Sequence, residues 1–154
     1  MNILILRDPR ESKAKCSLTP LRGLSDVRFV DYHHERRLAA GERILLHPEG
    51  ELFSEADRGL DLLLIDCSWR RVDKLLATVD GTLHARRLPE LVTAYPRKSK
   101  VFEDPACGLA SVEALYAACL LMGEERAEFL EEYRWKEEFL RQNADFSNLG
   151  AQRR

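Results

Sequence analysis

Residues 65–69 place side chains that could bind or act on a small charged ligand next to one another. The run IDCSW contains a carboxylate, a thiol, a hydroxyl and an indole. The apolar run before it, at residues 61–66 (DLLLID), is typical of a central strand covered on both faces, and Ser68 is predicted to cap a helix over residues 69–78. Ligands of open α/β sheets bind beyond the carboxyl ends of the strands, and a helix N-terminus there favours an anionic group. The junction is therefore a candidate ligand site; the alternative is that its polar residues only cap the helix and that Trp69 packs in the core.

Two further loops carry hydroxyl groups, at residues 16–19 (CSLT) and 109–111 (LAS). Hydroxyls near element boundaries more often cap helices or form local turns than contact ligands, so their spacing alone is weak evidence for a site. The sequence contains no P-loop, nucleophile elbow or dinucleotide-binding glycine motif. The cysteines form no CxxC pair, and the adjacent His33 and His34 would point to opposite faces of a strand. We therefore expect reduced thiols and no metal site.

The charge of the chain is unevenly distributed. The net charge is −2, yet residues 68–100 carry eight basic residues against three acidic ones. A basic segment on an acidic protein is either a footprint for RNA phosphates or an ordinary solvated face, and charge alone favours neither. The candidate RNA-binding residues in it are Arg70, Arg71, Arg86, Arg87, Arg97, Lys98 and Lys100.

Length and composition suit one compact unit: the chain has 154 residues, of which 45% are hydrophobic and 32% are charged. Strand patterns come first and helix patterns follow, which predicts an α/β fold with a sheet region over residues 1–80 and a helical region over residues 81–154. No apolar run approaches the roughly 20 residues that cross a bilayer. The first residues also lack the basic start and the cleavage site of a signal peptide. We therefore expect no membrane partner and a cytoplasmic location.

Hydrophobic periodicity and turn residues predict the individual elements. A turn is expected at residues 48–50 (PEG), and a short helix should begin at Ser54. The other predicted elements are strands at residues 2–7, 27–32, 42–47 and 61–66, and helices at residues 69–78, 111–122, 125–133 and 135–143.

Short motifs over nearly the whole chain make it similar to a known family. DCSW at residues 66–69 and RRLP at residues 86–89 are specific when they occur together. The other matching segments are KCS (15–17), ILLHPEGE (44–51), SEADR (54–58), SVEAL (111–115) and YRWKEEFLRQN (133–143). In these residues the chain resembles the ribosome-biogenesis aminocarboxypropyltransferases, which modify a hypermodified pseudouridine in small-subunit ribosomal RNA of archaea and eukaryotes.

This resemblance implies a fold related to the SPOUT-type methyltransferases, with an N-terminal, mostly parallel sheet and a helical C-terminal part threaded through a trefoil knot. Knots are exceptions to ordinary chain connections, so the residue pattern alone would not predict one. The resemblance also implies S-adenosylmethionine as donor of a 3-amino-3-carboxypropyl group, which is moved to a ring nitrogen of a uridine or pseudouridine in ribosomal RNA. The expected partner is ribosomal RNA or a precursor of the small ribosomal subunit, bound by a monomer.

Site residues follow from the resemblance by position. Trp69 would form part of the apolar wall of the donor pocket, since an aromatic face suits a cationic sulfur. Asp66 would either accept a proton from the acceptor base, as a catalytic residue, or hold the amino group of the donor. The second role is favoured because an ordinary carboxylate is a poor base for so weak an acid. The other positions that match cofactor contacts are Ser17, Ile65, Leu88, Cys107 and Ser111.

The chain departs from the family pattern after the RRLP motif. It has YPRKS at residues 95–99, where the family has Asn-Pro followed by Asn-Tyr-Gly, and its loop over residues 96–111 is longer. Cys107 stands where an aromatic residue is expected. Two other functions stay open: a knotted S-adenosylmethionine-dependent RNA methyltransferase, and a non-catalytic RNA-binding assembly factor with a relic pocket. The altered loop favours the second of these alternatives.

Overall fold

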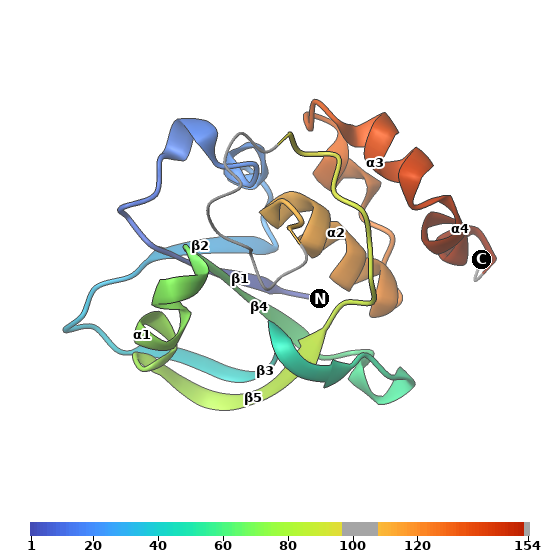
Figure 1. The fold of residues 1–154 in the computed structure, drawn as a ribbon. Helices are drawn as coiled ribbons and strands as arrows, with labels where there is room; N and C mark the ends of the chain where they lie inside the picture. The colour runs from blue at the N-terminus through green and yellow to red at the C-terminus, as the bar shows by residue number, and fades with distance from the viewer. Residues whose placement is uncertain (97–107, 153–154) are drawn as a thin grey trace.

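The protein has an α/β fold built on one parallel sheet, as predicted. The computed structural model describes residues 1–96 and 108–152. Its five strands are arranged in the order β2-β1-β4-β3-β5, and every neighbouring pair is parallel (Figure 1). The strands are β1 (Ile3–Arg7), β2 (Val27–Asp31), β3 (Leu38–Leu52), β4 (Asp61–Asp66) and β5 (Val79–Arg87).

Helices cover the two faces of the sheet unequally. The longer helices α2, α3 and α4 lie together on one face, and the short helix α1 lies on the other (Figure 1). The helices are α1 (Val72–Leu76), α2 (Ser111–Leu121), α3 (Lys136–Gln142) and α4 (Ala144–Gln152), with 3-10 turns at Lys13–Lys15, Thr19–Leu21, Glu55–Asp57, Trp69–Arg71 and Ala127–Leu130.

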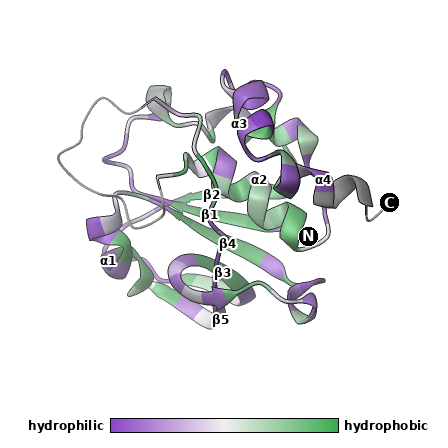
Figure 2. Ribbon diagram, turned by 45° about the vertical axis from the view of Figure 1, so that its right-hand side comes forward, coloured by the Kyte–Doolittle hydropathy of each residue, from purple (hydrophilic) through white to green (hydrophobic). Residues whose placement is uncertain are grey.

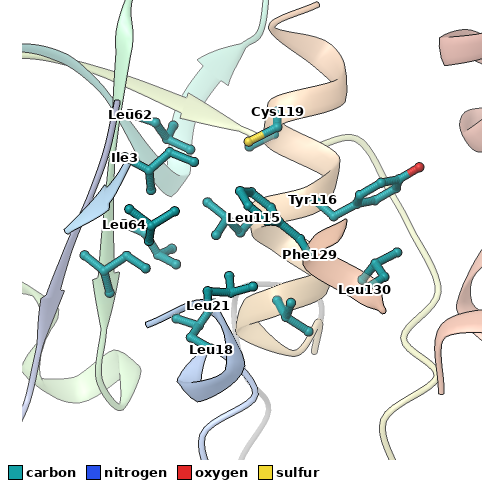
Figure 3. Close-up of a cluster of buried hydrophobic side chains, with 14 of the residues drawn as sticks. Ile3, Leu18, Leu21, Leu62, Leu64, Leu115, Tyr116, Cys119, Phe129 and Leu130 are labelled. Atoms are coloured by element: carbon teal, nitrogen blue, oxygen red, sulfur yellow. The ribbon is translucent and has the colours of Figure 1, made fainter. Parts of the chain in front are cut away.

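Strand alternation divides the apolar side chains into two cores. Ile3 and Ile5 of β1 point toward α2, and Leu4 and Leu6 point to the opposite face. The larger core lies between β1, β4, α2 and the turns that follow β1 (Figure 3). Figure 2 shows that β1 and β4 are largely hydrophobic along their length. These two strands are fixed in the middle of the sheet because burial on both faces requires continuous apolar sequence.

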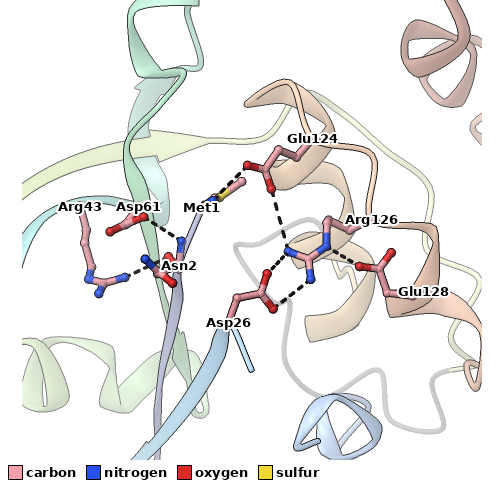
Figure 4. A network of polar contacts seen from close by, with 8 residues as sticks. All are labelled: Met1, Asn2, Asp26, Arg43, Asp61, Glu124, Arg126 and Glu128. Atoms are coloured by element: carbon pink, nitrogen blue, oxygen red, sulfur yellow. Dashed lines mark hydrogen bonds and ion pairs between the residues drawn. The ribbon is translucent and has the colours of Figure 1, made fainter. Parts of the chain in front are cut away.

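A polar network ties the beginning of the chain to the segment after α2 (Figure 4). The Arg126 guanidinium lies 2.8 Å from Asp26 and also pairs with Glu128. The amino group of Met1 donates to Glu124 at 3.1 Å. These contacts hold the N-terminal ends of β1 and β2 against the helical layer, so the edge opposite the carboxyl ends of the strands is closed by ion pairs.

Several expected elements differ from the structure. The helix expected over residues 69–78 is a 3-10 turn followed by the short α1. The helix expected over residues 125–133 contains only the 3-10 turn Ala127–Leu130, while α4 and β5 were not predicted. Strand β5 was not predicted because most of its residues are exposed or half-buried, so it lacks a continuous apolar run.

The turn expected at residues 48–50 is also wrong as a chain reversal. These residues stay within β3, which runs far past the expected strand at residues 42–47. The register between β3 and β5 breaks between Leu46 and Glu51, and the turn residues lie in this irregular part of the strand. Proline is tolerated at such positions because no regular ladder hydrogen bond is lost.

Among the described residues, no helix is long and apolar enough to span a membrane.

The close approach of β3 and β5 predicts a stability difference between two glycine substitutions. A Cβ atom at Gly50 would lie 2.5 Å from the backbone of Ala85, whereas a Cβ at Gly23 would meet nothing within 4 Å. Gly50→Ala should therefore lower the free energy of unfolding by about 1–3 kcal/mol through overpacking. Gly23→Ala should be neutral or slightly stabilising. Urea denaturation of both variants measures the difference, and equal stabilities would contradict the observed β3–β5 contact.

Candidate functional site

Three segments that are far apart in the sequence meet at the carboxyl end of β4. The carboxylate of Asp66 accepts a hydrogen bond from the Cys16 thiol, with 3.2 Å between Sγ and Oδ2. It accepts another from the hydroxyl of Ser111, with 3.2 Å between Oγ and Oδ1. The hydroxyl of Ser17 accepts the backbone N–H of Val112 at 3.1 Å, at the start of α2. The structure thus brings Ser17, Asp66 and Ser111 together around one carboxylate.

Arg7 is a site residue that the sequence did not reveal. It ends β1 directly beside Asp66 in the parallel register, and only 1% of it is exposed. Its Nε lies 4.0 Å from Oδ2 of Asp66, and its Nη2 donates to the carbonyl of Glu11 at 2.5 Å. Nε itself makes no hydrogen bond to the described residues. The guanidinium therefore balances the charge of Asp66 and keeps one N–H free for another acceptor.

The indole of Trp69 lies open at this edge of the sheet. It is 46% exposed, and the guanidinium of Arg70 lies 5.7 Å from the centre of its ring. The alternative that Trp69 packs in the core is therefore wrong. Ser68 precedes the turn as expected, but its hydroxyl makes no capping hydrogen bond; its carbonyl accepts the N–H of Arg71 at 2.9 Å. An exposed aromatic face is suited to a ligand that carries a positive charge.

The two thiols at this edge are not nucleophiles. Burial, together with the nearby Asp8 and Asp66 carboxylates, raises the pKa of Cys67 to about 12. Burial and Asp66 also raise the pKa of Cys16. Because their pKa values are raised, both thiols stay protonated at neutral pH. A thiol attacks only as its thiolate, so neither group is a ready nucleophile. Cys16 acts instead as a hydrogen-bond donor to Asp66.

Two other residues expected to contact the donor, Ile65 and Leu88, pack against the cores on opposite faces of the sheet. Ile65 precedes Asp66 on β4, and its half-buried side chain packs on the sheet face opposite α2. Leu88 follows β5 and packs half-buried against the larger core. The structure gives no direct contact between either side chain and Asp66. Cys107 lies outside the described residues, as do three of the expected RNA contacts, Arg97, Lys98 and Lys100.

The described basic residues fall into two groups. Arg71 donates from Nε to Asp8 at 2.5 Å, and Arg86 donates from Nε to Asp57 at 2.9 Å. Both acceptor carboxylates are buried, so these arginines are held by ion pairs inside the fold. Arg70 and Arg87 have exposed side chains. Among the expected RNA contacts that the structure describes, these two are the most accessible.

The buried carboxylate of Glu113 holds the segment at residues 93–94 against the start of α2. It is 0% exposed and accepts hydrogen bonds from the Thr93 hydroxyl at 2.6 Å and from the backbone N–H groups of Ala94 at 2.9 Å and Ala110 at 2.8 Å. The preceding residue, Val92, is held by Asn143, whose side-chain amide makes two hydrogen bonds of 2.8 Å with the backbone N–H and carbonyl of Val92. From the sequence, only the position of Glu113 in the first turn of a helix could be predicted. A glutamate there can accept the backbone N–H of the residue before the helix.

The arrangement offers an anionic carboxylate with a compensating guanidinium, two hydroxyls and an accessible indole at the carboxyl edge of a parallel sheet. These groups suit a ligand with an amino group and a cationic centre, for which Asp66 and Trp69 are complementary. Among the described residues, no group of three or more histidine, cysteine, aspartate or glutamate side chains could hold a metal ion.

Comparisons with known proteins identify the family. Residues 44–150 match the family model described as ribosome biogenesis protein, C-terminal. A 16S rRNA aminocarboxypropyltransferase from Vulcanisaeta distributa is 32% identical over 148 residues, which cover 90% of this chain and 75% of that protein. The corresponding enzyme from Methanosphaera stadtmanae is 26% identical over 149 residues, which cover 93% of this chain and 84% of that protein.

The fold is shared with a relative of solved structure. The SAM-dependent rRNA acp-transferase Tsr3 from Vulcanisaeta distributa superposes with a TM-score of 0.71 at 29% sequence identity. The match covers 98% of this chain and 83% of that chain. The family match spans most of the chain, and the sequence and fold comparisons agree. The chain therefore belongs to the ribosome-biogenesis family of the 16S rRNA aminocarboxypropyltransferases.

Proposed function

We propose that this protein transfers the 3-amino-3-carboxypropyl group of S-adenosylmethionine to a ring nitrogen of a uridine or pseudouridine in ribosomal RNA. The observation that carries the proposal is the convergence of Ser17, Asp66 and Ser111 at the end of β4, with an accessible Trp69 in the turn that follows, in a chain of the aminocarboxypropyltransferase family. When bound, the donor supplies a sulfonium whose attached carbons are open to attack by a nucleophile. The residues of the protein decide which of these carbons faces the RNA.

Trp69 is the residue proposed to make this choice. Its exposed ring offers an apolar, electron-rich surface that a sulfonium and its methyl group can cover. If the methyl group packs on the indole, the aminocarboxypropyl carbon is left facing the acceptor base. Leu88 and the backbone of Ile65 would complete the wall of the pocket, and the two serines would hydrogen-bond polar groups of the donor.

Asp66 is proposed to hold the amino group of the donor. Its carboxylate already accepts hydrogen bonds from Cys16 and Ser111 and lies near the guanidinium of Arg7. The two hydrogen bonds occupy both carboxylate oxygens, and an ordinary carboxylate is a poor base for so weak an acid as a uridine N–H. A carboxylate is a good partner for an ammonium group. Deprotonation of the acceptor base is therefore assigned to the solvent or the RNA environment rather than to Asp66.

The finer features implied by the family resemblance belong to this proposal as well. They are a SPOUT-like fold with a trefoil knot in the helical part, a division of the compact chain near residue 80, a cytoplasmic location and a monomeric state. The proposed partner is the ribosomal RNA of the small subunit or of its precursor. Arg70 and Arg87, the exposed residues among the expected RNA contacts that the structure describes, are proposed to contact its phosphates, together with Arg97, Lys98 and Lys100.

The transferred group can be identified directly from the product. Ribosomal RNA incubated with the protein and S-adenosylmethionine should gain the mass of an aminocarboxypropyl group on one nucleoside, as measured by mass spectrometry of the digested RNA. A gain equal to one methyl group would instead identify a methyltransferase. Donor binding without any added mass would identify an RNA-binding assembly factor.

Removal of the indole should weaken donor binding. Trp69→Ala should raise the dissociation constant for S-adenosylmethionine roughly 2- to 30-fold, because an aromatic–cation contact contributes about 0.5–2 kcal/mol. Trp69→Phe should retain part of the affinity because it keeps an aromatic face. Isothermal titration calorimetry measures both constants. An unchanged affinity of the alanine variant would exclude the indole from the pocket.

The neighbouring Arg86 and Arg87 should respond differently to alanine substitution. Arg87→Ala should lower RNA affinity and reduce the salt dependence of binding by about one phosphate contact, without changing stability. Arg86→Ala should instead lower the free energy of unfolding by about 1.5–3 kcal/mol, because it removes the hydrogen-bonded partner of the buried Asp57. Salt-dependent RNA binding and thermal unfolding of the two variants separate these effects. Identical behaviour in both assays would refute the distinction.

A further inference from the structure

A cavity of about 410 Å³ lies on the sheet face opposite α2, between β2 and the beginning of β3. Its apolar floor includes Leu6, Val30 and Leu38, which belong to the smaller core. Its rim carries Arg28 and two further arginines from the loop that leads into β3. None of these basic residues lies in the basic segment at residues 68–100, so this surface is separate from the one that the sequence suggested.

Two of the three rim arginines are uncommitted. Arg37 donates to Asp80 and, at 2.7 Å, to the carbonyl of Ala77, so its charge is compensated. Within residues 1–96 and 108–152, the exposed guanidinium groups of Arg28 and Arg36 have no hydrogen bond or ion pair. Asp31 is the carboxylate that lines the cavity, and strand alternation directs its side chain to the other face from Arg28. The cavity therefore carries an excess of positive charge.

The remaining wall suits a nucleotide. Tyr32 and His33 line the cavity beside the arginines. Guanidinium groups bind phosphates, and aromatic rings stack on unpaired bases, which is the combination that single-stranded RNA requires. A larger groove of about 760 Å³ along α3 is less suited to phosphates. Three glutamates on its wall offset the charge of two arginines and a lysine.

The cavity lies near the carboxyl edge where the donor site is placed. The N–H of Tyr32 donates to the carbonyl of Arg7 at 2.7 Å, and the Arg71 guanidinium lies 5.9 Å from the centre of the tyrosine ring. Strand β1 alone separates β2 from β4, so the end of β2 is roughly 10 Å from Asp66 across two strand spacings. An RNA strand that crosses this edge can place one nucleotide at Asp66 and its neighbours at the cavity.

We propose that this cavity binds phosphates of the substrate RNA that flank the acceptor nucleotide, with Arg28 and Arg36 as the contacting residues. The proposal rests on the proposed function, because it takes RNA to be the substrate. It assigns to the edge of β2 a positioning role that is distinct from donor binding: the cavity fixes the strand while the other face of the sheet holds the donor.

The test compares two double variants with the same change in net charge. Arg28→Ala with Arg36→Ala should reduce the salt slope of binding to a transcribed small-subunit rRNA fragment by about two, one for each phosphate contact. The KM for this RNA should rise several-fold with kcat retained, and the affinity for S-adenosylmethionine should not change. Arg134→Ala with Arg141→Ala, on the groove along α3, is the matched control and should leave the salt slope nearly unchanged.

Three outcomes would overturn the proposal. The first is an unchanged salt slope of RNA binding in the Arg28→Ala, Arg36→Ala variant while it still unfolds cooperatively. The second is an equal decrease of the salt slope in the Arg134→Ala, Arg141→Ala control. The third is that the Arg28→Ala, Arg36→Ala variant loses binding of inorganic phosphate but keeps its RNA affinity, which would identify a site for small anions. RNA binding is measured without turnover. A failure of the wild type to transfer the aminocarboxypropyl group would therefore refute the proposed function, while the salt slope still tests the cavity.

Discussion

The carboxylate of Asp66 is the charge around which the site must be built. It stands at the end of a strand that is buried on both faces, where an uncompensated carboxylate would be costly to desolvate. Arg7 supplies the opposite charge from the neighbouring strand, and Cys16 and Ser111 supply hydrogen bonds from the loop after β1 and the start of α2. Satisfying one buried charge therefore requires three distant segments to converge. The cluster of polar side chains at the carboxyl end of β4 is the consequence of that requirement.

The parts of the fold that depend on continuous burial could be predicted from the sequence. Strands β1 and β4 each contain a continuous apolar run, because both of their faces are covered, and α2 is a mostly apolar segment that is buried on nearly every side. Strand β5 could not be predicted, because it lies at the edge of the sheet and most of its residues are partly exposed. The PEG segment at residues 48–50 resembles a turn, yet β3 accommodates it through a break in register that only the partner strand determines.

The candidate site shows the same limit at the level of single residues. The strand-to-helix junction identified Asp66 from its local pattern, whereas the approach of Ser17 and Ser111 to it could be expected only from family resemblance. Arg7 and Glu113 were missed because their partners are distant in sequence, and a buried charge looks like any other charged residue until its partner is known. The adjacent Arg86 and Arg87 are likewise indistinguishable in the sequence, although a buried partner holds one of them and the other is exposed.

The most direct measurement is a crystal structure of the protein with S-adenosylmethionine bound. In that structure we expect the amino group of the donor within hydrogen-bond distance of Asp66, the methyl group packed against Trp69, and the aminocarboxypropyl carbon facing the open edge of the sheet. A donor bound elsewhere, or one whose methyl group faces that edge while its amino-acid arm is buried, would contradict this expectation.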